Sequence, residues 1–297
     1  MNKYFVVSDI HGFYDELIEA LNTAGYDKNN LNHTLIVAGD IFDRGPKPKE
    51  VYEFLKDLPK ERRILIKGNH EQLFIDLANK PMPEEHDYTN RTVQTYYQLA
   101  GLDSLGDFLL DVYNHYIIGD FDLELYWNQA KKAIKKSDVL KWLQSDEWID
   151  YYELDKFIIV HSFIPLMETE RIRESKFYVR RTYDYNHNWR TDSTKDEWDA
   201  SRWGCPWKHY LNELFKEEEK KGKTLVCGHW HTSDFYKYLN KDFNDTSEIF
   251  YSSGIIAIDG GVYYKNGELY HPCNVLIIEN NKCYNKYGEE LKEALTK

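Results

Sequence analysis

The sequence predicts an α/β (α+β) fold in which parallel strands are accompanied by antiparallel hairpins. Two short apolar segments, at residues 4–7 and 34–38, enclose an amphipathic helical pattern at residues 14–24. A strand–helix–strand unit of this kind places its two strands parallel. In the last third of the chain, Asn266-Gly267 between two β-type segments is a strong hairpin signal, which predicts antiparallel pairing. At 297 residues the chain is long enough for one large domain.

The same periodicity criteria predict the remaining elements. Further buried strands are expected at residues 64–67, 157–160, 224–227, 255–258 and 274–278, and helices at 49–58 and 71–80. Residues 81–150 predict a helical insertion beside the sheet, with one helical stretch over 131–148. Residues 166–222 are polar, aromatic and basic, and we expect them to form a cap region on the substrate side of the domain. The charged run at 216–221 within them predicts a solvated helix face. We expect a single domain over residues 1–297.

Composition and charge limit the classes of partner. The formal net charge is -12 and acidic residues are spread along the chain, which disfavours nucleic acid and anionic membranes as partners. A small anionic substrate is compatible, because bound divalent metals would invert the local charge. The four cysteines show no CxxC spacing, and no apolar segment resembles a signal or a membrane span. We therefore expect a cytoplasmic protein in a reducing compartment.

The turn after the strand at 34–38 is the centre of the predicted site. It places Asp40 and Asp43 three residues apart, with Arg44 beside the second carboxylate. Ligands in open α/β sheets bind at the carboxyl ends of strands. Two acids and a base in such a turn indicate a cation site that also receives an anion. The alternative for this turn alone is a charged surface loop.

Polar residues also follow four other predicted strands. The five strand ends carry, in order, Asp9 and His11; Asp40 and Asp43; Asn69 and His70; His161; and His229 and His231. Each set alone has a simple structural explanation, such as a helix cap or an Asp–His hydrogen bond. Buried polar groups are costly without partners, and one shared pair of divalent metals would satisfy all of them.

The chemistry of these side chains suggests phosphoester hydrolysis. Oxygen and nitrogen ligands without thiolate suit manganese, iron or zinc, and Asp40 is the natural bridging carboxylate. Two such metals would activate a bridging hydroxide for in-line displacement at phosphorus. Arg44 would hold phosphate oxygens, and His70, oriented by Asp43, would protonate the leaving oxygen.

Three sequence blocks carry a family resemblance. They read Ser8-Asp-Ile-His-Gly12, Gly39-Asp-Ile-Phe-Asp-Arg-Gly45 and Gly68-Asn-His-Glu71, each after a strand. With these blocks the chain resembles the calcineurin-like metallophosphoesterases. More narrowly, it resembles the PPP-type serine/threonine phosphatase branch, which includes symmetrical diadenosine-tetraphosphate hydrolases. The resemblance implies two mixed β-sheets sandwiched between helices, with a helical insertion.

The resemblance also implies a role for each matching residue. The expected ligands are Asp9 and His11 at the first metal, Asp40 as the bridge, and Asn69, His161 and His229 at the second metal. Asp43 and His70 would form the acid pair, while Arg44 and Asn69 would contact the substrate. Glu71 is expected to support the site from behind the ligands rather than to bind metal.

Three departures from the family pattern qualify these roles. The fourth block reads Val160-His-Ser-Phe163 in place of Val-His-Ala-Gly, so the ligand is retained but the loop after it differs. The fifth, Gly228-His-Trp-His231, has a second histidine; the broader superfamily uses it on the first metal, so we expect His231 to be a ligand, with pocket lining as the alternative. Arg202 is our candidate for a second phosphate-binding arginine; it competes with Arg171, Arg173, Arg180, Arg181 and Arg190.

The resulting prediction is a serine/threonine-phosphatase-like phosphomonoesterase that uses two divalent metals, with manganese preferred over iron or zinc. Its partner would be a phosphoprotein or a small phosphate ester. The first alternative is a diadenosine-tetraphosphate-type hydrolase of nucleotide phosphoanhydrides, because Trp230 and the aromatic residues of 177–207 could stack a base. The second is a non-catalytic scaffold of the same fold. The sequence does not specify an oligomeric state.

Overall fold

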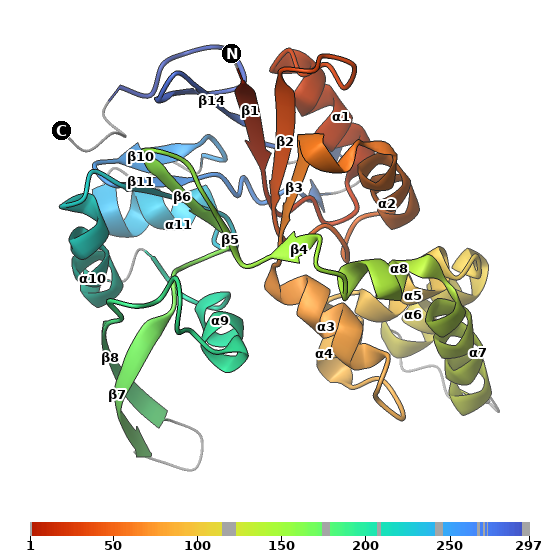
Figure 1. Cartoon of the computed structure of the whole chain (residues 1–297). Coiled ribbons are helices and arrows are strands. Elements are labelled where there is room, and N and C mark those ends of the chain that lie inside the picture. Colours follow the sequence, from red (N-terminus) through yellow and green to blue (C-terminus); the bar gives the residue numbers. More distant parts are fainter. Residues whose placement is uncertain are drawn as a thin grey trace.

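The computed structural model consists of two mixed β-sheets that face each other, with helices on the outside (Figure 1). It describes residues 2–114, 123–173, 179–206, 209–240, 246–265, 268–269, 271 and 273–292. This architecture confirms the predicted fold class. Among the described residues, no helix is both long and apolar enough to cross a bilayer.

The first sheet has the strand order β15-β14-β1-β2-β3-β4. Its strands are β1 (Lys3–Val7), β2 (His33–Ala38), β3 (Arg63–Ile66), β4 (Trp148–Ile149), β14 (Leu276–Glu279) and β15 (Lys282–Tyr284). β1 and β2 run parallel, as the strand–helix–strand pattern predicts. β3 and β4 continue the parallel order, and β14 is antiparallel to β1. The turn between β14 and β15 contains Asn280 and Asn281, both with positive φ, which is the backbone that a two-residue hairpin requires.

The second sheet has the order β10-β11-β9-β6-β5. Its strands are β5 (Tyr151–Glu153), β6 (Phe157–Val160), β9 (Thr224–Cys227), β10 (Phe250–Ser252) and β11 (Ile255–Ala257). The central strands β6, β9 and β11 are parallel, and β5 and β10 pair antiparallel at the edges.

Side-chain alternation divides the core into three layers. In β1, Val6 packs between the two sheets, whereas Phe5 and Val7 pack beneath the outer helices. In β9, Val226 likewise faces the inter-sheet core, while Leu225 and Cys227 face the helices of the second sheet. Because successive side chains of a strand point to opposite faces, continuously apolar strands are suited to burial on both sides.

The outer helices of the first sheet include the predicted insertion. The helices are α1 (Tyr14–Thr23), α2 (Pro48–Asp57), α3 (Asn69–Leu77), α4 (Glu85–Thr89), α5 (Thr92–Leu99), α6 (Asp103–Asn114), α7 (Leu123–Lys136) and α8 (Asp138–Leu143), with the short 3₁₀ turn η1 (Lys60–Arg62) after α2. The helical stretch predicted over 131–148 is present in α7 and α8, but it is broken between them and is wrong at Trp148. Ser137 has extended backbone between α7 and α8, and Trp148 belongs to β4, where it pairs with Leu65.

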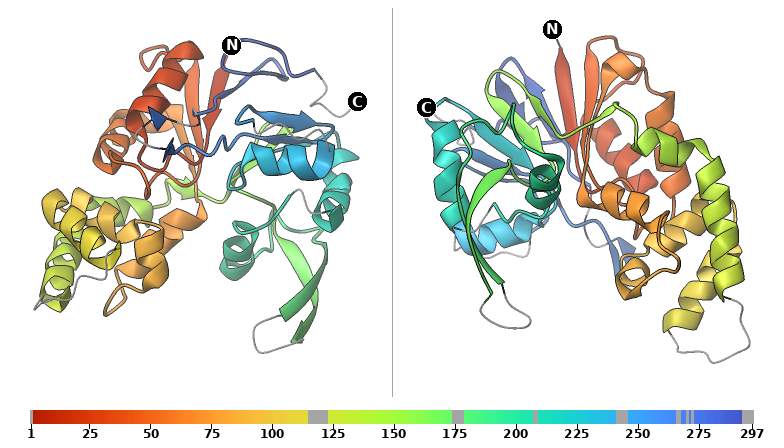
Figure 2. Two further views of the ribbon diagram at one scale, coloured as in Figure 1. Left: turned by 180° about the vertical axis from the view of Figure 1, so that it is seen from behind. Right: turned by 60° about the horizontal axis from the view of Figure 1, so that its bottom comes forward.

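The second sheet carries the region between β6 and β9. It consists of the hairpin β7 (Leu166–Arg173) and β8 (Val179–Tyr185), then α9 (Lys195–Ser201) and α10 (His209–Glu219). The prediction that residues 216–221 are a solvated face is wrong for Glu218, which is fully buried because Arg190 pairs with its carboxylate. Figures 1 and 2 show that the β7–β8 hairpin and the helical insertion extend from the same end of the molecule, on opposite sides of it.

The remaining elements complete the second sheet and the C-terminal part. They are α11 (Thr232–Phe235), the short π-helical segment η2 (Tyr236–Asn240), β12 (Tyr264–Lys265) and β13 (Glu268–Leu269). β12 and β13 pair antiparallel; the predicted Asn266-Gly267 turn itself lies outside the described residues.

The ends of β2 and β3 approach each other closely at two glycines. Gly39 has φ of +88°, and a Cβ built there would lie 2.5 Å from His161 Nδ1 and 2.6 Å from Gly68 Cα. A Cβ at Gly68 would collide with Asp40 Oδ1. Two residues without side chains therefore allow the polar turns after β2 and β3 to lie against each other.

We expect Gly39→Ala to destabilise the fold more than Gly25→Ala. Gly25 has a similar φ of +74°, but a Cβ added there would have no atom within 4 Å, so its substitution measures backbone strain alone, about 1 kcal/mol. Gly39→Ala adds a steric collision that should cost a further ~1–3 kcal/mol. Urea unfolding measures both free energies, and equal losses would contradict the close approach.

Candidate metal centre

The predicted site residues come from both sheets and meet at one edge of the sandwich. Asp9 and His11 follow β1, Asp40 follows β2, His161 follows β6 and His229 follows β9. The parallel strands of both sheets end at this edge, which is why side chains so distant in sequence come together. Asp9, His11, Asp40, Asp43, Asn69, His70 and His161 are all buried.

Backbone strain is concentrated in the same turns. Nine non-glycine residues of the described chain have positive φ, and six of these are predicted site residues: Asp9, His11, Asp40, Asp43, Arg44 and His229. Left-handed backbone is uncommon outside glycine and persists only where surrounding contacts enforce it. The fold thus holds these side chains in directions that relaxed strand ends would not adopt.

The first group of candidate ligands surrounds His11. Its Nδ1 lies 2.8 Å from the carbonyl oxygen of Phe42, and a carbonyl only accepts, so Nδ1 carries the proton. The Nε2 of the neutral ring then presents a lone pair. This atom is buried, has no hydrogen-bond partner in the described chain, and lies 3.8 Å from Asp40 Oδ2 and 3.9 Å from Asp9 Oδ1. A buried lone pair beside two carboxylates suits a cation.

The second group surrounds His161 and repeats this arrangement. His161 Nδ1 donates to the carbonyl oxygen of Ala38 at 2.8 Å, which leaves the lone pair on Nε2. That atom lies 2.8 Å from Asn69 Oδ1, 3.3 Å from His229 Nδ1 and 3.4 Å from Asp40 Oδ2. Asp40 therefore borders both groups through one oxygen, the place expected of a bridging ligand.

The electrostatics of the site favour ligand-competent histidines. Burial lowers the pKa of His11 and of His161, and burial together with His161 lowers the pKa of His229 to about 3. These rings are therefore neutral at physiological pH, as metal ligands must be. Burial and the carboxylates of Asp259 and Asp40 raise the pKa of Asp9 well above its usual value. A bound cation would relieve this repulsion, so the donor set fits the two divalent ions that the fold family implies.

A separate acid pair lies beside the two groups. His70 Nδ1 is 2.6 Å from Asp43 Oδ2, so its Nε2 faces the site, 3.9 Å from Asp40 Oδ2 and 3.4 Å from Arg44 Nη2. Burial alone would lower the pKa of His70, but the carboxylates of Asp40 and Asp43 outweigh it and raise the pKa. The ring is therefore able to carry a proton toward the site. By distance alone, His70 Nε2 could also join His11 and Asp40 as a ligand.

Two acidic residues support the ligands from behind. The Glu71 carboxylate accepts the backbone N–H groups of Asp40, Ile41 and Gly68 at 2.7–2.9 Å, which holds the β2 and β3 turns together. Asp259, which was not among the residues predicted from the sequence, is buried and raises the pKa of Asp9. It follows β11, so the strand-end criterion used for the other residues would have found it.

Two further predicted residues are placed differently. His231 is exposed at the start of α11, against Gly261, and belongs to neither group; its role as a ligand stays a prediction. Arg202 is buried, pairs with Asp150 and Asp199, and donates from Nε to the carbonyl oxygen of Lys67 at 3.2 Å. Each nitrogen of the guanidinium thus has an acceptor within the chain; a role of Arg202 in phosphate binding stays a prediction.

A third cluster of possible ligands, in the insertion, already surrounds the ammonium group of a lysine. Glu84, His86 and Asp87 lie close enough to share an ion. The Lys80 ammonium already contacts all three, at 2.9 Å each. This cluster is therefore an ion-pair network.

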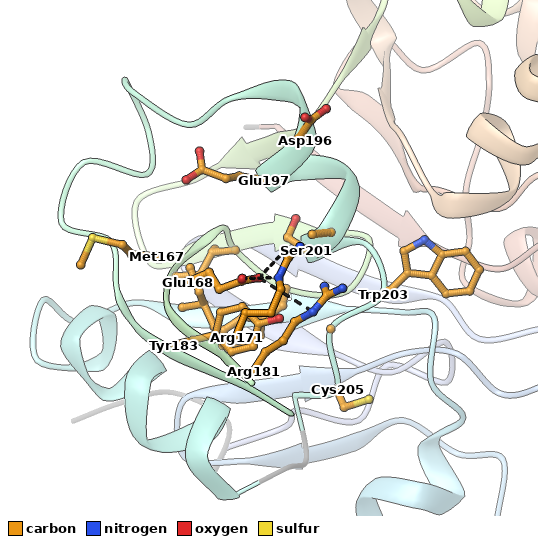
Figure 3. Close-up of a pocket in the computed structure, with 15 residues that line it drawn as sticks. Met167, Glu168, Arg171, Arg181, Tyr183, Asp196, Glu197, Ser201, Trp203 and Cys205 are labelled. Carbon is orange, nitrogen blue, oxygen red and sulfur yellow. Dashed lines mark hydrogen bonds and ion pairs between the residues drawn. The ribbon is translucent and has the colours of Figure 1, made fainter. Parts of the chain in front are cut away.

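A pocket of about 790 Å³ opens next to the second group. Its wall includes Phe163, Ile164, Leu166 and Met167, with Arg171 and Arg181 paired to Glu168. Trp203 is 53% exposed, and its ring lies edge-to-face with His229 at a centroid distance of 5.5 Å. In Figure 3 the indole lies apart from the charged residues and reaches toward the ribbon of the N-terminal strands. The pocket thus borders the candidate metal centre through Trp203.

Comparisons with known proteins agree with this arrangement. Residues 3–233 match the family model described as calcineurin-like phosphoesterase. Similar curated proteins include two asymmetrical bis(5'-nucleosyl)-tetraphosphatases PrpE. The one from Bacillus velezensis is 37% identical over 28% of this chain and 36% of its own length. The one from Bacillus subtilis is 24% identical over 75% of this chain and 83% of its own length.

Comparison with solved structures supports the fold. A crystal structure of a cold-active protein-tyrosine phosphatase from a psychrophilic Shewanella species aligns over 100% of this chain and 81% of its own, with a TM-score of 0.50 and 16% identity. The family model covers most of the chain, and its residues include every strand end that supplies the two ligand groups. The chain belongs to the calcineurin-like phosphoesterase family.

Proposed function

We propose that this protein is a dinuclear-metal-dependent phosphoester hydrolase, acting as a serine/threonine-phosphatase-like phosphomonoesterase. The observation that carries the proposal is the set of unprotonated imidazole nitrogens around Asp40 Oδ2, with a protonatable histidine beside them. His11, Asp40 and Asp9 would hold one ion, and Asp40, Asn69, His161 and His229 the other. Manganese is the preferred ion, with iron or zinc as alternatives, because the donors are imidazole, carboxylate and amide.

The bound ions would supply the charge that activates water and stabilises the phosphoryl oxygens. The residues of this chain perform the remaining tasks. Arg44 is exposed at the open side of the acid pair, where its guanidinium can bind phosphate oxygens. His70 donates a proton from Nε2 to the leaving oxygen as the phosphorus–oxygen bond breaks, while Asp43 fixes the ring through Nδ1.

A cytoplasmic location belongs to the same proposal. All four cysteines are buried, and they form no disulfide with one another in the described part of the chain, which suits a reducing compartment.

A second candidate function is hydrolysis of a nucleotide phosphoanhydride. The exposed Trp203 ring beside His229 offers a flat surface for a base at the edge of the phosphate site, and relatives of this chain are named bis(5'-nucleosyl)-tetraphosphatases. The sequence predicts this role for Trp230 and for the aromatic residues of 177–207, which include Trp203. Trp230 is half-buried and donates its indole N–H to the Gly204 carbonyl oxygen. Trp203 is therefore the better candidate.

Replacing Asp40 by Asn should remove one of the two bound ions and abolish turnover, because the shared oxygen loses its charge. The control is Asp57→Asn, a surface carboxylate whose side chain is 79% exposed. Manganese per chain is measured by elemental analysis after equilibration and gel filtration. Two ions and near-normal turnover in Asp40→Asn would rule out the bridging role.

Replacing His70 by Asn should slow hydrolysis of alkyl phosphates by about 10²–10⁴-fold. Esters with good leaving groups, such as p-nitrophenyl phosphate, should lose much less, because their leaving oxygen needs no proton. Metal content serves as the control and should stay the same. Equal losses on both classes of ester would mean that His70 is a ligand rather than the proton donor.

The two candidate functions differ in their dependence on Trp203. If a nucleotide is the substrate, Trp203→Ala should raise KM for diadenosine tetraphosphate about tenfold, since stacking contributes ~1–3 kcal/mol per base, and Trp203→Phe should restore it. KM for a phosphoserine peptide is the comparison. If the wild type prefers the peptide, and Trp203→Ala does not change KM for diadenosine tetraphosphate, the nucleotide function is excluded and the phosphomonoesterase function is retained.

A further inference from the structure

We infer that helix α5 of the insertion is a positioning element for the Asp43–His70 pair, and that Thr92 is the residue through which it acts. This inference rests on the proposed function, because it assigns a role within the same site. It concerns a helix that lies outside all of the sequence blocks that define the site.

Thr92 contacts the acid pair directly. Its hydroxyl donates to Asp43 Oδ2 at 2.7 Å, the same oxygen that lies 2.6 Å from His70 Nδ1. Thr92 and Asp43 are both fully buried. The other carboxylate oxygen, Oδ1, is buried without a hydrogen-bond partner in the described chain. The orientation of this side chain therefore depends on the two donors at Oδ2, of which Thr92 is one.

The rest of α5 holds the backbone of the same turn. The Thr95 hydroxyl accepts the Asp43 N–H at 3.2 Å, Arg91 Nη1 donates to the Arg44 carbonyl oxygen at 3.1 Å, and Gln98 Nε2 donates to the Pro46 carbonyl oxygen at 3.2 Å. Together with Thr92, four residues of one helical segment contact the turn from Asp43 to Pro46. Arg91 itself has a φ of 62° at the start of α5, a strained conformation of the kind found in the site turns.

The same helix is fixed to the element that carries His70. Tyr96 of α5 is buried, donates its hydroxyl to the Phe74 carbonyl oxygen of α3 at 2.6 Å, and packs on the Phe74 ring at 4.3 Å between centroids. His70 lies one turn earlier in α3. α5 thus ties both halves of the acid pair, the β2 turn and α3, to one rigid support.

Loss of the Thr92 donor would free the Asp43 carboxylate to rotate about its side chain. His70 would then lose the fixed direction of its Nε2, which matters when a proton is transferred to a leaving oxygen. Substrate and metal contacts would remain. The effect should therefore fall on kcat for poor leaving groups rather than on KM or on metal content.

The test compares Thr92→Val, which removes the hydroxyl at nearly constant shape, with Thr92→Ser, which retains it. The control is Thr89→Val, an exposed threonine in the neighbouring helix α4 whose hydroxyl donates to the His86 carbonyl oxygen. All proteins are loaded with manganese, and folding is checked by urea unfolding. Thr92→Ala, which is smaller, replaces Thr92→Val if the latter does not fold.

We expect Thr92→Val to lower kcat for an alkyl phosphate about tenfold, as for loss of one hydrogen bond to a charged group, and for p-nitrophenyl phosphate less than threefold. KM and manganese content should not change, and Thr92→Ser and Thr89→Val should remain within twofold of wild type. Wild-type kcat on both esters, or equal losses on both, would overturn the inference.

A second readout does not need catalysis. In metal-free protein, the His70 Nδ1 proton should give a downfield proton resonance that His70→Asn removes. Thr92→Val should shift or broaden this resonance, and Thr89→Val should not. An unchanged resonance in Thr92→Val would overturn the inference, whether or not the wild type hydrolyses phosphate esters. Absence of hydrolysis by the wild type would count against the proposed function alone.

Discussion

The crowding of acceptor atoms around Asp40 Oδ2 is the constraint on which the rest of the structure depends. His11 and His161 each donate their single ring proton to a backbone carbonyl, so both direct a lone pair at a carboxylate oxygen. Such a set of buried acceptors is unfavourable without a positive charge. The backbone strain of the turns, the two close glycines and the Glu71 carboxylate all serve to hold this set in place.

Much of this arrangement was predictable from the sequence because short-range signals are strong at strand ends. The runs at 34–38, 157–160 and 224–227 are too apolar and too short to be anything but buried strands, and the structure has strands at all three. Parallel strands then bring their carboxyl ends to one edge. The convergence of Asp40 with His161 needs one thing more, because β2 and β6 belong to different sheets: the two sheets must pack together with their carboxyl ends at the same edge.

Long-range contacts of the insertion were not predictable in the same way. Thr92 sits in a helical pattern with no motif, and only the packing of α5 against the β2 turn brings it to Asp43. Similarly, the charged run that contains Glu218 has the composition of a solvated face, yet Arg190 from another segment makes burial of one carboxylate favourable. Trp148 fits a helix by periodicity, but pairing with β3 decides its conformation. In each case a distant partner outweighs local propensity.

Both sheets supply candidate ligands, and this has a consequence for how the protein holds together. Apolar side chains such as Val6 and Val226 join the sheets in the middle of the sandwich. At its functional edge, hydrogen bonds such as that from His161 to the Ala38 carbonyl oxygen also connect the sheets, but the acceptor atoms that face one another beside these bonds repel. An ion bound by Asp40 and His161 would link the two sheets there. Because it would bind the folded chain and not the unfolded one, its binding would stabilise the folded state by mass action. Depletion of metal would therefore lower the free energy of unfolding of the hydrolase as well as its activity.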